Sequence, residues 1–115
     1  MNTELIIEFV HAINDKNLVA MSNCLSTDHC FTDSSRNSVN GIEATLKAWK
    51  SYFNKFPDYQ LEVEKQIHHG NAIAIFTTVS GNTKKQSDTV SRNAIAWKIE
   101  MKNKKIKSLN VYTTF

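Results

Sequence analysis

The sequence is poor in the residues that mark unusual classes of chain: its 115 residues include three glycines, one proline and two cysteines. Together with 41% apolar and 22% charged residues, this excludes collagen-like and disordered chains. Two cysteines cannot form the disulfide framework of a small secreted domain. The longest apolar run, residues 72–76, has five residues, whereas a membrane-spanning helix needs about 20. We therefore expect one cytoplasmic domain over residues 1–115, with no membrane partner.

Common catalytic and metal-binding motifs are absent as well. The chain has no Gly-rich phosphate loop and no HExxH, CxxC or GxSxG sequence. His68 and His69 are adjacent, so on a strand they point to opposite faces and cannot both bind one metal ion. We therefore expect no metal and no cofactor. Cys24 is expected to be packed in the core, while a nucleophilic pair of Cys30 with a histidine stays open.

The net charge of +3 is unevenly distributed, because residues 84–107 hold eight basic residues against two acidic ones. A basic segment can attract nucleic acid or an anionic substrate. It can also be a lysine-coated sheet edge that resists aggregation. Lysine outnumbers arginine here and few aromatic residues are interleaved, which disfavours a nucleic-acid partner.

Hydrophobic periodicity changes halfway along the chain. Helices are predicted over residues 3–14, 17–25 and 41–56, and Pro57 ends the third. The third helix has the strongest pattern, with apolar residues at steps of 4, 3, 4 and 3: Ile42, Leu46, Trp49, Phe53 and Phe56. One strand is predicted before the third helix, over residues 28–34. Four more are predicted after that helix, over residues 61–67, 72–80, 88–101 and 105–114. Turns at residues 69–71, 81–82 and 102–104 join these four strands.

Helices first and strands second indicate an α+β fold, with three N-terminal helices packed on one face of an antiparallel sheet. Residues 72–80 are apolar at odd and at even positions, so both faces of that strand must be shielded from water. A second copy of the chain provides that cover most simply. We therefore expect a homodimer that packs sheet to sheet.

Asp33 is the candidate catalytic residue, because it ends the strand segment Cys30–Phe31–Thr32 just before a polar loop. A carboxylate close to apolar side chains acquires a raised pKa and can serve as a general base. Alternatively, Asp33 accepts hydrogen bonds from the Ser34 or Ser35 amides and only caps the loop. The spacing alone favours the capping role.

An apolar ligand cavity is the second functional expectation. Many large rings accompany small residues such as Ala72, Ala74, Ala94 and Ala96 on the strands. Rings that face small residues leave room for a pocket, although the rings can also simply fill a core. A tyrosine can supply a polar group inside such a pocket. The expected lining is Phe9, Phe31, Trp49, Phe53, Ala96 and Tyr112.

The order of these motifs resembles a known family. Phe31-Thr32-Asp33, a polar loop, Gly41, an aromatic helix and then Phe56-Pro57-Asp58-Tyr59 are similar to the SnoaL-like polyketide cyclase and ketosteroid isomerase group of the nuclear transport factor 2-like superfamily. The resemblance implies a cone-shaped roll in which a strongly curved antiparallel sheet wraps three helices around a deep apolar pocket. It also implies dimers formed through the sheet.

The resemblance carries over to activity only in part. Asp33 matches the general base of the isomerases. Phe9 and Ala96 stand where those enzymes have a tyrosine and a protonated aspartate that stabilise the oxyanion, and loss of one such donor lowers the rate by about 10²–10³. Tyr112 is followed by threonines rather than by the acid common in the cyclases. Efficient steroid isomerisation is therefore not expected.

Three functions stay open at this point. The first is a cofactor-independent isomerase or cyclase in which Asp33 takes a proton from an apolar carbonyl substrate. The second is a non-catalytic dimeric module of the same fold that binds a ligand or another protein. The third, the least favoured, is a nucleic-acid binder that uses the basic segment 84–107. Fold alone does not decide among them.

Overall fold

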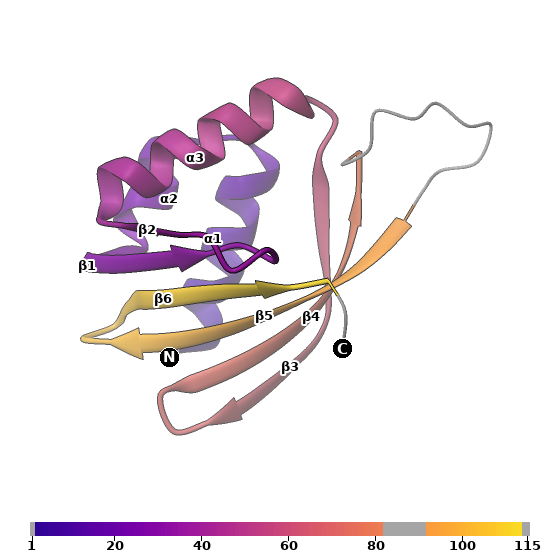
Figure 1. Cartoon of the computed structure of the whole chain (residues 1–115). Helices are drawn as coiled ribbons and strands as arrows, with labels where there is room; N and C mark the ends of the chain where they lie inside the picture. Colours follow the sequence, from indigo (N-terminus) through magenta and orange to yellow (C-terminus); the bar gives the residue numbers. More distant parts are fainter. Residues whose placement is uncertain (1, 82–91, 114–115) are drawn as a thin grey trace.

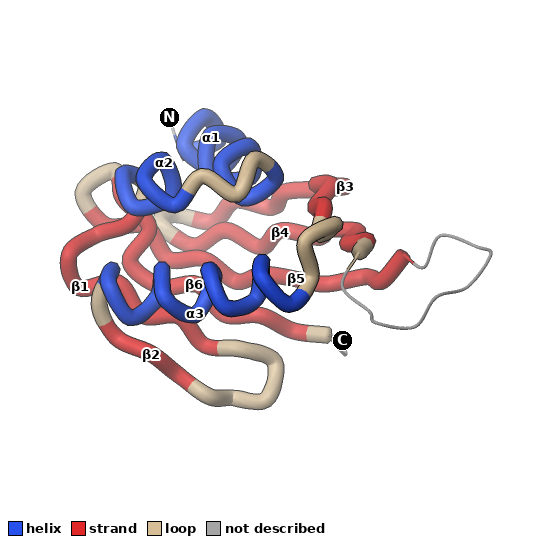
Figure 2. The backbone as a smooth tube through the Cα atoms, turned by 90° about the horizontal axis from the view of Figure 1, so that it is seen from above, coloured by secondary structure: helices blue, strands red, loops and turns tan. Residues whose placement is uncertain are grey.

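The computed structural model describes residues 2–81 and 92–113, with the backbone alone for Asn2, Arg92 and Asn93. In the described part of the chain, three helices lie on one side of a single six-stranded sheet (Figures 1 and 2). The helices are α1 (Asn2–Asn14), α2 (Leu18–Asn23) and α3 (Ile42–Lys55). The strands are β1 (Leu25–Thr32), β2 (Ser38–Asn40), β3 (Gln60–His69), β4 (Ala72–Ser80), β5 (Arg92–Lys102) and β6 (Lys105–Tyr112).

The predicted α+β architecture is confirmed, with one correction to the sheet. The strand order is β2-β1-β6-β5-β4-β3, and β3 to β6 form the expected antiparallel meander. However, β1 runs parallel to β6, with Phe31 opposite Leu109, so the sheet is mixed rather than wholly antiparallel. Hydrophobic periodicity is a local signal and cannot reveal which strand pairs with another one nearly 80 residues away. The short strand β2 was also not predicted, because its three residues lack an apolar alternation.

The helix α3 ends as expected and buries its aromatic stripe. Trp49 and Phe53 are 6% and 7% exposed, so the predicted stripe does face the sheet. The helix stops at Lys55, and Phe56 takes a non-helical φ of −129° before Pro57. A residue before proline avoids helical geometry because the proline ring clashes with it. The chain therefore turns back at once to begin β3.

Strands β4 and β5 present unlike residues to their two faces. Ile73, Ile75 and Val79 on β4 are buried beneath the helices, as are Trp97 and Ile99 on β5. The intervening residues point away from the helices and are small or half-exposed: Ala72, Ala74, Phe76, Thr78, Ala94 and Ala96. Alternation with a period of two produces this division.

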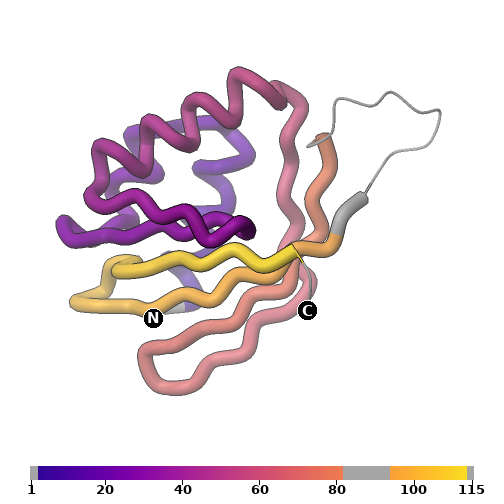
Figure 3. The backbone as a smooth tube through the Cα atoms, viewed as in Figure 1, coloured from indigo at the N-terminus to yellow at the C-terminus, as the bar shows by residue number. Residues whose placement is uncertain are grey.

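The sheet is strongly bent. The tube in Figure 3 shows β3 and β4 turning through a large angle along their length, and the register of this pair shifts between Val63 and Lys65. A shift of this kind is a β-bulge, which bends a strand and increases its twist. Gly81 completes the bend: its φ is +74°, and a Cβ atom there would lie 2.2 Å from the Asp58 carbonyl oxygen.

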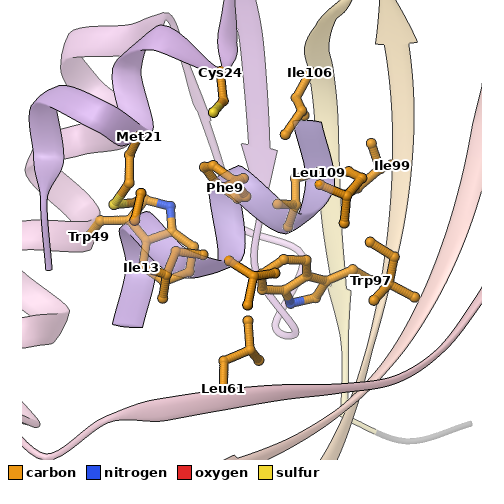
Figure 4. Packing of buried hydrophobic residues seen from close by; sticks show 14 of the residues in the cluster. Phe9, Ile13, Met21, Cys24, Trp49, Leu61, Trp97, Ile99, Ile106 and Leu109 are labelled. Carbon is orange, nitrogen blue, oxygen red and sulfur yellow. The ribbon is translucent and has the colours of Figure 1, made fainter. Parts of the chain in front are cut away.

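The core lies between the helices and the sheet and is centred on Phe9. Its ring packs at 6.1 Å from Trp97 and at 6.5 Å from Trp49, both in edge-to-face geometry. Figure 4 shows Phe9 of α1 enclosed between these rings and the aliphatic side chains of Ile106 and Leu109 on β6. None of the helices in the described part of the chain is long and apolar enough to cross a membrane.

Candidate functional site

A cavity of about 380 Å³ opens at the end of the molecule where β1 and β6 finish. Its lining residues come from α3 on one side and from β5 and β6 on the other, and the loop after β1 contributes to it as well. Its lining consists of aromatic residues, polar residues and three smaller apolar residues. The lining comprises Phe31, Trp49, Tyr52, Tyr59 and Trp97, then Asp33, Ser34, Ser35 and Thr113, and finally Ala48, Ile95 and Val111.

Asp33 lies at the mouth of the cavity and organises the loop that it begins. Its Oδ1 accepts hydrogen bonds from the backbone amides of Ser35 and Asn37, both at 2.9 Å. The Asp33 amide in turn donates to the Asn37 carbonyl oxygen at 2.9 Å. This arrangement is an Asx turn, a common conformation for an aspartate at the start of a loop. The second carboxylate oxygen, Oδ2, has no hydrogen-bond partner among the described residues.

Arg36 ties the same loop to β6. Its Nη2 donates to the carbonyl oxygens of Asp33 at 3.0 Å and Val111 at 2.6 Å. The guanidinium carbon lies 4.4 Å from the centre of the Tyr112 ring, in a cation–π contact. These contacts hold the mouth in place without bringing a positive charge into the cavity lining.

Tyr59 is one of the cavity residues absent from the expected lining, as are Tyr52 and Trp97. Only 4% of Tyr59 is exposed, and burial, with a smaller contribution from Tyr52, raises the pKa of its hydroxyl above the usual value near 10. The rings of Tyr52 and Tyr59 meet edge to face at 5.2 Å. The helix stop at Pro57 is visible in the sequence, and the Tyr59 amide donates to the Phe56 carbonyl oxygen at 3.1 Å, but this local contact does not show that Tyr59 lines a cavity.

The residues predicted to line a pocket separate into three groups. Phe31 and Trp49 do line the cavity. Phe9 and Phe53 pack against Trp49 within the closed core, at ring distances of 6.5 and 5.6 Å. The third group, Ala96 and Tyr112, lies on the opposite face of the sheet.

Strand alternation explains where Ala96 and Tyr112 lie. Trp97 and Val111 form a register pair that faces the cavity, so the neighbouring pair of Ala96 and Tyr112 must point away from it. Tyr112 is 36% exposed on that outer face.

The histidines and cysteines form no cluster at the cavity. Among residues 2–81 and 92–113 whose side chains are described, no three His, Cys, Asp or Glu side chains could hold a metal ion together. His29 is buried, and its Nδ1–H donates to the Ile106 carbonyl oxygen at 2.8 Å. Burial lowers the pKa of His29, although the hydrogen bond partly opposes this. Burial also raises the pKa of the Cys24 thiol to about 11, so this thiol is unreactive at neutral pH.

The basic segment is only partly described, since the side chains of Lys84, Lys85 and Arg92 lie outside the described residues. Two of the remaining lysines make local contacts. Lys102 forms an ion pair with Asp28 at 2.9 Å, and Lys105 donates to the Asn23 carbonyl oxygen. These contacts fit a solvated strand end, and none of these lysines lines the aromatic cavity.

Solved structures with the same fold place this architecture among known proteins. A provisionally named polyketide cyclase from Sinorhizobium meliloti is 18% identical, with a TM-score of 0.83 over 94% of this chain and 93% of that one. A hypothetical protein from Catenulispora acidiphila with a ketosteroid isomerase-like fold, solved with trimethylamine, is 18% identical, with a TM-score of 0.81 over 97% and 86%. TerC, co-crystallised with polyporic acid, is 12% identical, with a TM-score of 0.85 over 98% and 91%.

These likenesses support the fold, which is nuclear transport factor 2-like. A search of curated proteins returned no match. The family model of the SnoaL-like domain, in contrast, matches residues 6–109, nearly the whole chain. This match includes the helices, the cavity walls apart from Val111 and Thr113, and the loop that carries Asp33. The chain therefore belongs to the SnoaL-like domain family.

Proposed function

We propose that this chain binds a small, largely apolar carbonyl compound in the aromatic cavity and that Asp33 exchanges a proton with it. The observation that carries the proposal is the position of Asp33, which supplies the only carboxylate among the described residues of the cavity lining. The volume of about 380 Å³ lies within the range of small-molecule sites, about 300–1,000 Å³. No cofactor is required for a proton transfer of this kind.

The geometry around Asp33 supports a role as proton acceptor. Oδ1 is held by two backbone amides, so the carboxylate has a defined orientation. Oδ2 is then the oxygen that would take a proton from the carbon next to the ligand carbonyl. The same proton would return to that carbon, or to a conjugated carbon of the ligand, so that the carboxylate is regenerated.

Related structures agree with a small-molecule role. One fold neighbour was co-crystallised with polyporic acid and another was solved with trimethylamine. Others are described as polyketide cyclases. At identities below 20% these neighbours do not identify the ligand, so the proposal relies on the lining residues of this chain.

Proton exchange on cyclic ketones tests the proposal directly. We expect the wild-type chain to accelerate deuterium incorporation at the α-carbons of cyclic ketones, followed by ¹H NMR. Asp33→Asn should lower that acceleration by at least about 100-fold, the usual contribution of a general base. Asparagine keeps the oxygen that accepts from Ser35 and Asn37, so the loop should survive the substitution. Equal rates for the two proteins would remove Asp33 from the mechanism.

The second candidate function is passive ligand binding. It is favoured by the Asx turn itself, since two amides already occupy one carboxylate oxygen and give Asp33 a structural purpose. In that case wild type and Asp33→Asn would bind ligands equally and neither would accelerate exchange. The same NMR samples therefore distinguish the two functions.

A homodimer through the outer face of the sheet completes the proposal. Register pairs place Ile67 beside Ala74, and Phe76 beside Ala96 and then Tyr112. Ile67 is 48% exposed. A contiguous apolar surface of this kind is typical of a self-association face.

Sedimentation equilibrium tests the dimer. Ala96→Lys should shift the chain to monomers, because it buries a charge in the contact. The matched control is Ala44→Lys on the exposed side of α3, which should leave the association unchanged. A monomeric wild-type chain would contradict the dimer and leave the cavity proposal intact.

A further inference from the structure

We propose that the hydroxyl of Tyr59 donates a hydrogen bond to the carbonyl oxygen of the ligand, so that the cavity selects carbonyl compounds over hydrocarbons of the same shape. The inference depends on the proposed ligand site and identifies the hydrogen-bond donor within that site. Neither Tyr59 nor any residue of β3, which begins at the next residue, belonged to the expected pocket.

Tyr59 is held rigidly from its backbone. The Lys16 ammonium group donates to the Tyr59 carbonyl oxygen at 2.7 Å. Asn14 of α1 holds Leu61, two residues further on: its Nδ2 donates to the Leu61 carbonyl oxygen at 2.9 Å, and its Oδ1 accepts from the Leu61 amide at 2.8 Å. The end of α1 therefore fixes the start of β3, and the Tyr59 ring is oriented before any ligand arrives.

The Tyr59 ring is almost entirely buried, yet its hydroxyl lacks a protein partner. Only 4% of the residue is exposed, and no hydrogen bond joins the hydroxyl to another described residue. Buried tyrosine hydroxyls usually find a partner. Among the described side chains, the fully enclosed polar atoms without a partner are Thr45 Oγ1 and Trp49 Nε1. The Tyr59 hydroxyl is not one of them, so it keeps some accessible surface, and the void that Tyr59 borders is the cavity.

The charge of the lining indicates which acceptor this donor would meet. Among the described residues, no lysine, arginine or histidine lines the cavity, and Asp33 contributes a negative charge at its mouth. A carboxylate or phosphate ligand would be repelled by Asp33 and would find no cation. Burial raises the pKa of Tyr59, so the phenol stays protonated and able to donate throughout the neutral range. An uncharged carbonyl oxygen fits these conditions.

The same hydrogen bond would assist proton transfer. When Asp33 removes a proton next to the carbonyl, negative charge develops on the carbonyl oxygen. A donor oriented in advance toward that oxygen stabilises the charge. Tyr59, which directly precedes β3, would thus supply a donor that Phe9 and Ala96 cannot supply.

Affinity measurements with a matched pair of ligands test the inference. Acetophenone and ethylbenzene have similar shapes but differ in the carbonyl oxygen. The chain has two tryptophans, and both line the cavity, so their indole ¹⁵N–¹H signals report binding directly. We expect the wild-type chain to bind acetophenone about tenfold more tightly than ethylbenzene, as one buried hydrogen bond allows.

The substitution Tyr59→Phe should reduce this preference to about one while leaving the affinity for ethylbenzene unchanged. The matched control is Tyr112→Phe, which removes the same atom from the outer face of the sheet and should keep the preference. A preference that persists in Tyr59→Phe would overturn the inference and leave the ligand site standing. Failure of both ligands to shift either indole signal would contradict the proposed ligand site, and the inference with it.

A second measurement needs no variant and remains valid even if Tyr59→Phe does not fold. In the wild-type chain, affinity should rise from 4-nitroacetophenone to 4-methoxyacetophenone, because the carbonyl oxygen becomes a stronger hydrogen-bond acceptor. An affinity that stays flat, or falls, across this pair would overturn the inference.

Discussion

Strand β1 connects two regions in which polar side chains have different surroundings: one is closed and the other is open. In the closed part of the strand, four residues before Asp33, His29 is only 1% exposed, and its Nδ1–H is bonded to the Ile106 carbonyl oxygen. At its open end Asp33 lies at the mouth of the cavity, with Oδ2 unpartnered among the described residues. The closed part belongs to the packed core, and its polar group, the His29 imidazole, is hydrogen-bonded within the protein. The open end places Asp33 and Tyr59 in the lining of one cavity.

The largest effect on stability is expected from a substitution at the centre of the closed core. Phe9→Ala should lower the free energy of unfolding by about 3–5 kcal/mol, because it leaves a void between Trp49 and Trp97. Urea denaturation followed by circular dichroism measures this loss. The control is Ile7→Ala on the same helix, where the side chain is 47% exposed and the change should stay within about 0.5 kcal/mol. Equal losses at the two positions would show that Phe9 is not part of a close-packed core.

A smaller effect is expected from the buried histidine. Burial keeps the pKa of His29 below its ordinary value near 6.5, so the unfolded chain binds the proton more readily. The stabilisation is therefore complete above about pH 6.5 and is lost as the pH falls toward the folded pKa. Each unit of pKa difference corresponds to about 1.4 kcal/mol.

Thermal unfolding between pH 8 and pH 5 measures the contribution of His29. The loss of stability on acidification should be shallower in His29→Asn, whose amide can still donate toward the Ile106 carbonyl oxygen. Parallel pH profiles for the two proteins would contradict the assignment of this dependence to His29.

The smallest effect on stability is expected at the open end. Asp33→Ala removes the acceptor of the Ser35 and Asn37 amides and should destabilise the chain by about 1 kcal/mol, similar to the loss of a helix cap. Asp33→Asn keeps an acceptor oxygen and should have less effect on stability than Asp33→Ala. Urea denaturation of both variants separates the structural role of Asp33 from any catalytic role. The turn assignment fails if the two substitutions destabilise the chain equally.

The sequence predicted some of the residues that line the cavity, but not which face of each strand points toward it. The spacing of α3 identified Trp49 as an inward residue, and the strand end identified Asp33 as the carboxylate at a loop. Ala96 and Tyr112 were expected inside the cavity although alternation already excludes them once Trp97 is known to face inward. The choice between the two faces of β5 depends on which face the helices cover, and that information lies in distant parts of the chain.

Tyr59 illustrates the same limit. Its sequence context predicts only that a helix has ended and a strand begins. Its place beside the cavity depends on contacts of the neighbouring backbone with Asn14 and Lys16 of the N-terminal segment. It depends as well on the close approach of Gly81 to Asp58. Contacts between segments so far apart leave no local pattern that a reader of the sequence could recognise.

The amino-acid order alone determined where the helices and the longer strands form, though not the short strand β2, because propensity, periodicity and the proline after α3 act within a few residues. It also determined that the walls would be aromatic and that a carboxylate would end β1. The tertiary structure decided the rest: the parallel pairing of β1 with β6, the face on which each strand residue lies, and the presence of Asp33 and Tyr59 in the lining of one cavity. Those outcomes follow from how the sheet bends around the helices, which is a property of the whole chain rather than of any segment.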